Sequence, residues 1–201
     1  MQRPYDVVKR LIDFVVAMCL LVWLVPILGI VSLSVLLAQG RPVIFRQKRP
    51  GLNSKPFTIY KFRTMDNKPG EAEASEGNLE ITPLGRVLRS SSLDELPQLW
   101  NVFRGEMSLV GPRPLLTEYL PLYNSRQAKR HLVRPGLTGL AQVSGRNLLS
   151  WGDKLELDVE YTEIYSFKVD FSLLIRSLRV VVTRRGVSPD GADTMGRFKG
   201  S

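Results

Sequence analysis

The hydrophobic pattern begins with an uncharged run from Phe14 to Ala38. At about 1.5 Å per residue, a continuous helix of this length would extend about 37 Å, enough to cross the apolar core of a bilayer. Pro26 lies in the middle of the run, where its ring and its missing N–H kink or break a helix. Basic residues flank both ends, so the positive-inside rule gives no preferred direction of crossing. The run therefore predicts a re-entrant helix that enters one leaflet and returns; a kinked spanning helix is the alternative.

The pattern changes after this run. Two β-rich stretches between residues 42 and 65, separated by the turn-forming sequence Gly51–Ser54, predict a short hairpin. Apolar residues at helical spacing resume at Leu84–Leu88 and again just downstream. Because Pro97 is tolerated only in the first turn of a helix, the second of these helices should begin within Ser92–Glu95.

The last periodic segment is Asp170–Arg185, in which Asp170 is a candidate N-cap; a structural ion pair with an arginine of the site is the alternative. Its apolar positions share one face and its arginines lie mostly off that face, which is typical of a helix at a membrane surface. A core-packing helix with a solvated basic face fits equally well. The residues from Ser188 onward are rich in Gly and polar side chains and predict a loose tail.

Together these segments predict an α+β fold in three parts. Residues 1–40 form the Pro-broken re-entrant membrane helix. Residues 41–187 form a small, mainly helical cytoplasmic domain with a short β-hairpin and interfacial amphipathic helices. Residues 188–201 form the C-terminal tail.

The charge of the chain indicates anionic partners. The 201 residues carry a formal net charge of +9 and have a sequence pI of about 9.9. Phospholipid, a nucleotide, a phosphorylated lipid or nucleic acid would each suit this charge. The chain has one cysteine and one histidine, which excludes a disulfide framework and a Cys/His metal centre. The histidine, His131, lies in a basic run and is predicted to be solvated at the surface.

Two adjacent carboxylates, Asp94 and Glu95, are the candidates for chemistry. Local sequence alone favours a structural interpretation, because Ser92 and Glu95 match the S-x-x-E capping box and carboxylates suit the positive end of a helix. The surrounding cations favour a functional one. Arginines held by Pro and Gly turns are arranged to bind phosphate in a bidentate manner. The candidates for phosphate or substrate binding are Arg89, Arg113, Arg146, Lys61 and Arg63.

Taken in order, the motifs resemble the monotopic bacterial phosphoglycosyl transferases, small enzymes that begin glycan assembly on a polyprenyl phosphate. The resemblance runs from about Lys9 to Val187, so it covers nearly the whole chain. One position departs from the family pattern: the residue before the membrane proline, often small and polar there, is Val25 here. The motifs that carry the resemblance are KFRTM (Lys61–Met65), SLDELPQLWNV (Ser92–Val102), GPRP (Gly111–Pro114) and RPGLTGLAQVSGRN (Arg134–Asn147).

The resemblance implies transfer of a sugar 1-phosphate from a UDP-sugar, with an N-acetylated sugar expected, to undecaprenyl phosphate, with release of UMP. It implies Asp94 as the nucleophile of a covalent phosphosugar intermediate and Glu95 as its supporting carboxylate, with both near Mg²⁺. Arg89, Arg113 and Arg146 match the arginines of the phosphate site. The implied location is the cytoplasmic face of the bacterial inner membrane, in contact with phospholipid, for lipopolysaccharide or exopolysaccharide synthesis.

Two other functions stay open on the sequence alone. The chain could be a noncatalytic basic module at the membrane surface that binds anionic lipid or glycan-assembly partners, with Asp94 and Glu95 only capping a helix. A nucleic-acid binder is the weakest alternative, because the basic residues are tied to Pro/Gly turns and accompany a membrane segment. No nucleic-acid partner is therefore expected. The sequence leaves the oligomeric state open, a homodimer included.

Overall fold

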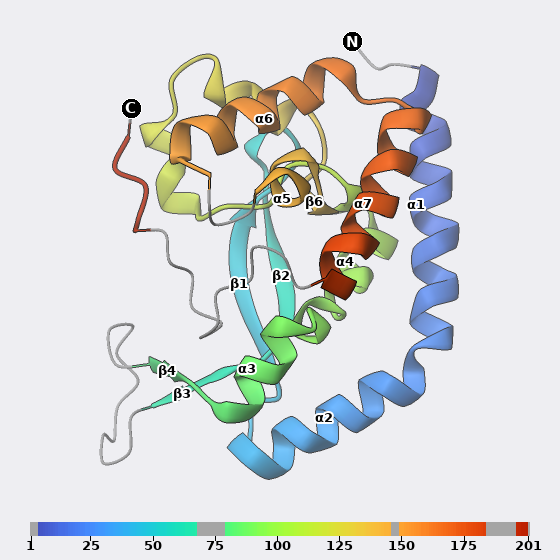
Figure 1. The fold of residues 1–201 in the computed structure, drawn as a ribbon, viewed down its shortest axis with the longest axis vertical. Helices are drawn as coiled ribbons and strands as arrows, with labels where there is room; N and C mark the ends of the chain where they lie inside the picture. Colours follow the sequence, from blue (N-terminus) through green and yellow to red (C-terminus); the bar gives the residue numbers. More distant parts are fainter. Residues whose placement is uncertain (1–3, 68–78, 146–148, 184–195, 201) are drawn as a thin grey trace.

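The computed structural model describes residues 4–67, 79–145, 149–183 and 196–200. Its N-terminal part is a pair of helices, α1 (Pro4–Trp23) and α2 (Val25–Gln39), which meet with a bend of 62°. Figure 1 shows the pair as an L along two sides of the remaining chain. Pro26 lies in the first turn of α2, so the predicted break at this proline is confirmed. No single described helix is long and apolar enough to cross a membrane, whereas the two helices of the bent pair together are.

The predicted hairpin is also confirmed. Strands β1 (Ile44–Pro50) and β2 (Pro56–Phe62) pair antiparallel, with Arg46 opposite Tyr60. In Figure 1 this hairpin forms the long axis of the domain inside the L. A second, short antiparallel pair follows, formed by β3 (Met65–Asn67) and β4 (Leu79–Ile81).

Two short helices come next. Helix α3 (Pro83–Ser90) begins where the periodicity predicts, and the Thr82 hydroxyl caps it by accepting a hydrogen bond from the Gly85 N–H at 2.9 Å. Helix α4 (Gln98–Arg104) begins later than the predicted start within 92–95. Pro97 is its N-cap rather than a residue of its first turn. The prediction was wrong because residues 93–95 form a separate 3₁₀ turn.

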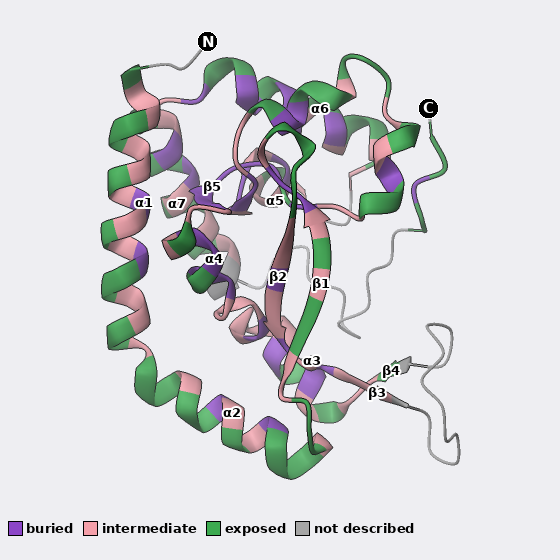
Figure 2. Cartoon of the chain, turned by 180° about the vertical axis from the view of Figure 1, so that it is seen from behind, coloured by how far each residue is buried: buried purple, intermediate pink, exposed green. Residues whose placement is uncertain are grey.

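The inner side of the L is fixed to this core. Ala17 of α1 is fully buried in the main hydrophobic cluster, which also contains Val102 of α4. Arg10 reaches the C-terminal end of α4, where its guanidinium donates hydrogen bonds of 2.7 Å to the carbonyls of Val102 and Phe103. Val35 of α2 is fully buried in a second cluster beneath the hairpin. Figure 2 shows the opposite, outward sides of both helices largely exposed.

A parallel strand pair follows α4 in the chain. It consists of β5 (Ser108–Val110) and β6 (Gly136–Thr138), followed by α5 (Leu140–Ser144). A Cβ atom at Gly136 would lie 2.1 Å from the Gly111 nitrogen, so only glycine permits this approach. The glycines of the RPGLTG motif thus serve close backbone packing.

Two longer helices complete the domain, α6 (Trp151–Ile164) and α7 (Phe167–Thr183). Figures 1 and 2 both place α7 beside α1. Asp170 joins them: it accepts hydrogen bonds from the hydroxyls of Tyr5 (2.8 Å) and Tyr161 (2.7 Å) and forms an ion pair with Lys9. Asp170 is therefore a buried side chain within the first turn of α7. It is not the N-cap that the sequence predicted.

The predicted loose tail is packed in the part that the structure describes. Phe198 is only 5% exposed and contacts the rings of Tyr119 and Trp151. The Trp151 indole N–H donates a hydrogen bond to the Gly196 carbonyl at 3.0 Å. Residues 188–195 and residue 201 lie outside the described residues. A buried aromatic ring is enough to fix a short polar segment, which a composition-based prediction overlooks.

Candidate active site

The two candidate carboxylates lie on the 3₁₀ turn Leu93–Glu95, between α3 and α4. Ser92, just before the turn, has φ 58° and ψ 16°, a left-handed conformation that is uncommon for a serine and is often found at functional sites. Its side chain makes no capping hydrogen bond, and the Glu95 side chain points to other partners. The capping box expected for Ser92 and Glu95 is therefore wrong.

Glu95 is the anionic centre of a small charge network. Its Oε1 atom lies 2.7 Å from Lys61 Nζ on β2 and 2.7 Å from Arg113 Nη2 in the GPRP loop. The second guanidinium nitrogen of Arg113 lies 3.5 Å from Oε2. Burial opposes ionisation of Glu95, but the charges and hydrogen bonds of Arg113 and Lys61 outweigh it and hold the pKa well below its usual range. Glu95 is therefore a fixed carboxylate.

Asp94 has a different environment. It is 7% exposed, and within the described residues no hydrogen bond to its carboxylate is seen. Burial and the neighbouring charge of Glu95 raise the pKa of Asp94 to about 6, against the smaller effects of Lys61, Arg113 and Arg89. The sequence predicted that Asp94 lies at a helix N-terminus, which would lower its pKa. That prediction was wrong because α4 begins four residues after Asp94.

Of the other three predicted cationic residues, the structure places Arg89 in the site and Arg63 elsewhere. Arg89 belongs to the site: its Nε donates a hydrogen bond of 3.0 Å to the Thr64 hydroxyl, and its charge acts on Asp94. Arg63 has another position, since its guanidinium donates to the carbonyls of Gln39 and Gly40 at the C-terminal end of α2. Arg146 lies outside the described residues.

A buried ion pair supports the loop that carries Arg113. Arg130 and Asp158 are each 2% exposed, and Arg130 Nη2 lies 2.6 Å from Asp158 Oδ2. The same nitrogen donates a hydrogen bond of 2.7 Å to the Arg113 carbonyl. From the sequence alone, Asp158 is expected on a charged face together with Glu160 and Glu163. Its burial could not be read from the sequence because its partner is 28 residues away.

A second support is Asn101 of α4, which is fully buried. Its amide nitrogen donates hydrogen bonds of 2.7 Å to the Thr58 carbonyl and to Glu106. Its amide oxygen accepts a hydrogen bond from the Tyr60 N–H at 3.3 Å. Asn101 therefore holds α4 against β2 and fixes the turn beside Lys61. Its place in the SLDELPQLWNV motif was the only signal for this role.

His131 is buried, not solvated as predicted, and it gives the fold a pH dependence. Burial and the charge of Arg130 lower the pKa of His131 from 6.5 to about 4. Between about pH 4 and pH 6.5, His131 is therefore mostly protonated in the unfolded chain and mostly neutral in the folded chain. Stability should fall as the pH falls through this window, by at most about 1.4 kcal/mol per pH unit. Because glutamine cannot be protonated, His131→Gln should reduce this slope in unfolding measurements between pH 4 and 7; an unchanged slope would contradict the assignment.

The carboxylate pair fits a hard divalent cation that is shared with a substrate. Among the described residues, no group of three or more His, Cys, Asp or Glu side chains could hold a metal alone. Mg²⁺ keeps several water molecules and is usually bound by one or two carboxylates together with substrate phosphates. Asp94 and Glu95 match that donor set, and among the described residues no hydrogen bond occupies the oxygens of Asp94.

Comparison with known proteins agrees with this site. Residues 4–184 match the bacterial sugar transferase family. The chain is 47% identical over 196 residues to an uncharacterized sugar transferase, EpsL, of Bacillus subtilis, with 97% of each chain covered. It is 40% identical to a UDP-glucose:undecaprenyl-phosphate glucose-1-phosphate transferase of Caulobacter vibrioides (89% of this chain, 71% of the relative). It is 37% identical to the protein of that name in Escherichia coli, of whose length it spans 38% (83% of this chain). The chain therefore belongs to the bacterial sugar transferase family, and its resemblance to the phosphoglycosyl transferases is confirmed.

Proposed function

We propose that this enzyme transfers a sugar 1-phosphate from a UDP-sugar to undecaprenyl phosphate and releases UMP. One observation carries the proposal: Asp94 is a buried carboxylate with no hydrogen bond among the described residues, and it adjoins Glu95, a carboxylate that two cations neutralise. The names of relatives in Caulobacter vibrioides and Escherichia coli support the same donor and acceptor class.

The chemistry takes two steps. An oxygen of ionised Asp94 attacks the phosphorus that carries the sugar, the bond from that phosphorus to the UMP oxygen breaks, and UMP leaves. A phosphate oxygen of the lipid then attacks the same phosphorus and frees the Asp94 carboxylate. Arg113, Lys61 and Arg89 offset the negative charge that gathers in both steps. Bound Mg²⁺ would supply further neutralisation of the diphosphate, held by Asp94 and Glu95.

The raised pKa of Asp94 supports this role. Without substrate the negative charges of Asp94 and Glu95 repel each other, and protonation of Asp94 removes this repulsion. A divalent cation would remove that repulsion and leave an ionised aspartate. The bond between a phosphate and a carboxylate is a mixed anhydride, which is reactive enough to pass the group on.

The experiment that tests this function is direct. Purified protein in detergent is mixed with undecaprenyl phosphate, Mg²⁺ and one UDP-sugar at a time. We expect UMP and a lipid-linked diphosphosugar in equal amounts, and loss of both with excess EDTA. The panel includes UDP-glucose, from the names of the relatives, and the UDP-N-acetylated sugars that the sequence led us to expect. A panel without UMP release would contradict the function.

We further propose that the bent helix pair is re-entrant and that the enzyme lies on the cytoplasmic face of the membrane. Helices α1 and α2 carry exposed apolar residues such as Leu11, Val22 and Leu37. Helix α7, beside α1, exposes a stripe formed by Phe167, Phe171, Ile175 and Leu178. Exposed apolar surface of this extent marks a membrane or protein contact.

Cysteine labelling tests this topology. We replace Cys19 with Ala and introduce single cysteines at Pro4 and at Lys48, before and after the helix pair. In intact spheroplasts both should be protected from an impermeant maleimide and react only after lysis, because a re-entrant pair leaves both ends inside. Labelling of one site before lysis would indicate a spanning helix.

A further inference from the structure

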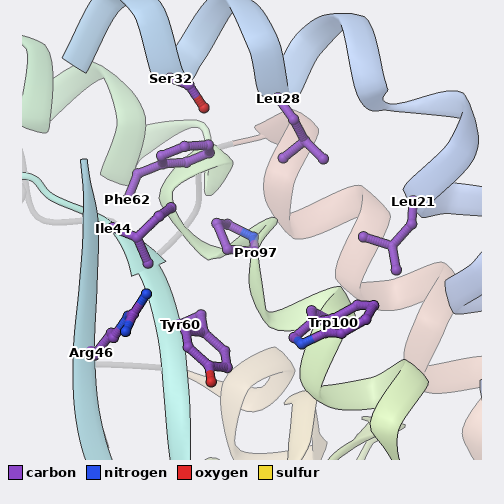
Figure 3. Close-up of a pocket in the computed structure, with 9 residues that line it drawn as sticks. All are labelled: Leu21, Leu28, Ser32, Ile44, Arg46, Tyr60, Phe62, Pro97 and Trp100. Atoms are coloured by element: carbon purple, nitrogen blue, oxygen red, sulfur yellow. The ribbon is translucent and has the colours of Figure 1, made fainter. Parts of the chain in front are cut away.

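A groove lies inside the L, between the bend of the helix pair, the hairpin and α4 (Figure 3). Its volume is about 310 Å³, at the small end of the ~300–1,000 Å³ typical of ligand pockets. Leu28 of α2, Phe62 of β2 and Trp100 of α4 belong to its apolar wall, and all three point into it (Figure 3). None of these residues takes part in the charge network of the active site.

One end of the groove is cationic. Arg46 of β1 lies at the groove with its guanidinium over the Tyr60 ring, 5.8 Å from the ring centre. Within the described part of the chain, Arg46 forms no ion pair with a carboxylate. An arginine stacked on an aromatic ring, with its hydrogen-bond donors unused, is prepared for an anionic group.

The groove adjoins the catalytic turn. Pro97, in its wall, follows Glu95 by two residues, so their Cα atoms are at most about 7.6 Å apart. Arg46 pairs across the hairpin with Tyr60, and their side chains lie on the face of the hairpin opposite to that of Lys61. A ligand in the groove would thus reach the catalytic turn at Pro97, from the face of the hairpin opposite to Lys61.

We propose that the groove binds the lipid acceptor, a polyprenyl phosphate, by the part of its chain next to the phosphate. The first isoprene units lie on Leu28, Phe62 and Trp100, and the phosphate meets Arg46. The rest of the long chain leaves past the bend of α1 and α2 into the bilayer. This inference rests on the proposed function, since it assigns that function's second substrate to a place. It makes Arg46 and Leu28 acceptor-specific residues, distinct from those that handle the UDP-sugar.

Kinetics of the two steps test the proposal. Arg46→Gln removes the cation and Leu28→Trp fills the groove; Lys48→Gln, on the same face of β1 but outside the groove, is the matched charge control. We expect each groove variant to raise the KM for undecaprenyl phosphate about tenfold or more, the effect of losing one charge-assisted or packing contact. UMP released without acceptor should match that of the wild type, and Lys48→Gln should change neither quantity. A parallel loss of acceptor-free UMP release would overturn the proposal, because it would place the groove in the first step.

A binding measurement is independent of turnover. A benzophenone-bearing farnesyl phosphate is photo-crosslinked to the protein in detergent, and the labelled peptides are identified by mass spectrometry. We expect labels on the peptides that contain Leu28 or Trp100, displaced by excess undecaprenyl phosphate and not by phosphatidylglycerol. Equal displacement by phosphatidylglycerol would mean a general lipid contact and would overturn the assignment. Failure of the proposed function itself would appear separately, as a wild type that releases no UMP.

Discussion

Asp94→Asn should abolish transfer while leaving the protein folded. Asparagine keeps the size of the side chain but is a far poorer nucleophile than a carboxylate, so we expect UMP release to fall by at least about 1,000-fold. In the wild type, incubation with the UDP-sugar and Mg²⁺ without lipid should add the mass of a sugar phosphate to the protein. Mass spectrometry should place this adduct on Asp94, and the variant should show no mass change.

Glu160→Gln is the control for this experiment. Glu160 lies exposed on α6, and its neutralisation changes the net charge by the same amount. It should retain activity and form the adduct. Full activity of Asp94→Asn would contradict the assignment of Asp94 as the nucleophile. UMP release without any adduct in the wild type would instead indicate direct transfer from the UDP-sugar to the lipid.

Glu95→Gln should have the second largest effect, a loss of activity of about 100-fold. Glutamine offers a weak metal ligand, and without the anion at position 95 Lys61 and Arg113 lose the partner that holds them 2.7 Å from it. The loss of a group that orients charged side chains or metal typically costs about 10- to 100-fold. The variant should also require more Mg²⁺ for half-maximal activity, which a titration of UMP release against Mg²⁺ measures.

Two further measurements separate the roles of Glu95. Glu118→Gln, at an exposed position outside the site, should keep the Mg²⁺ dependence of the wild type. The adduct on Asp94 should form in Glu95→Gln, but slowly, because the nucleophile is intact. A variant with reduced activity and an unchanged Mg²⁺ requirement would limit Glu95 to positioning Lys61 and Arg113. An unaffected rate would remove Glu95 from the site.

The local elements followed from the sequence where the signals were local. Pro26 in an uncharged run predicted the break between α1 and α2, because a proline at that position acts on its own turn of helix. Two β-rich stretches on either side of the Gly51–Ser54 turn predicted the hairpin. The start of α4 was misplaced because Pro97 was compatible with either the first turn or the N-cap position.

The motifs predicted which residues form the site, but not the contacts and pKa values of those residues. Asp94, Glu95, Lys61, Arg89 and Arg113 were all identified from the sequence. The sequence could not predict that Arg63 would bind the end of α2, because that choice depends on how the helix pair closes on the hairpin. From the sequence, every arginine in a motif is an equally good candidate for the site. Only the burial of each side chain and its distance from the carboxylates show which arginines belong to it.

The sequence by itself determined which groups this protein brings to its chemistry: a broken apolar segment, an adjacent pair of carboxylates and a set of cations in turns. Only the tertiary structure decided that the two carboxylates have different environments and different pKa values. Lys61 comes from β2 and Arg113 from a distant loop, and both reach Glu95, so this carboxylate stays charged. Asp94 is left buried beside it with a raised pKa. Coulomb energies and desolvation depend on separations through space, and residues adjacent in the chain acquire different environments only when the chain has folded.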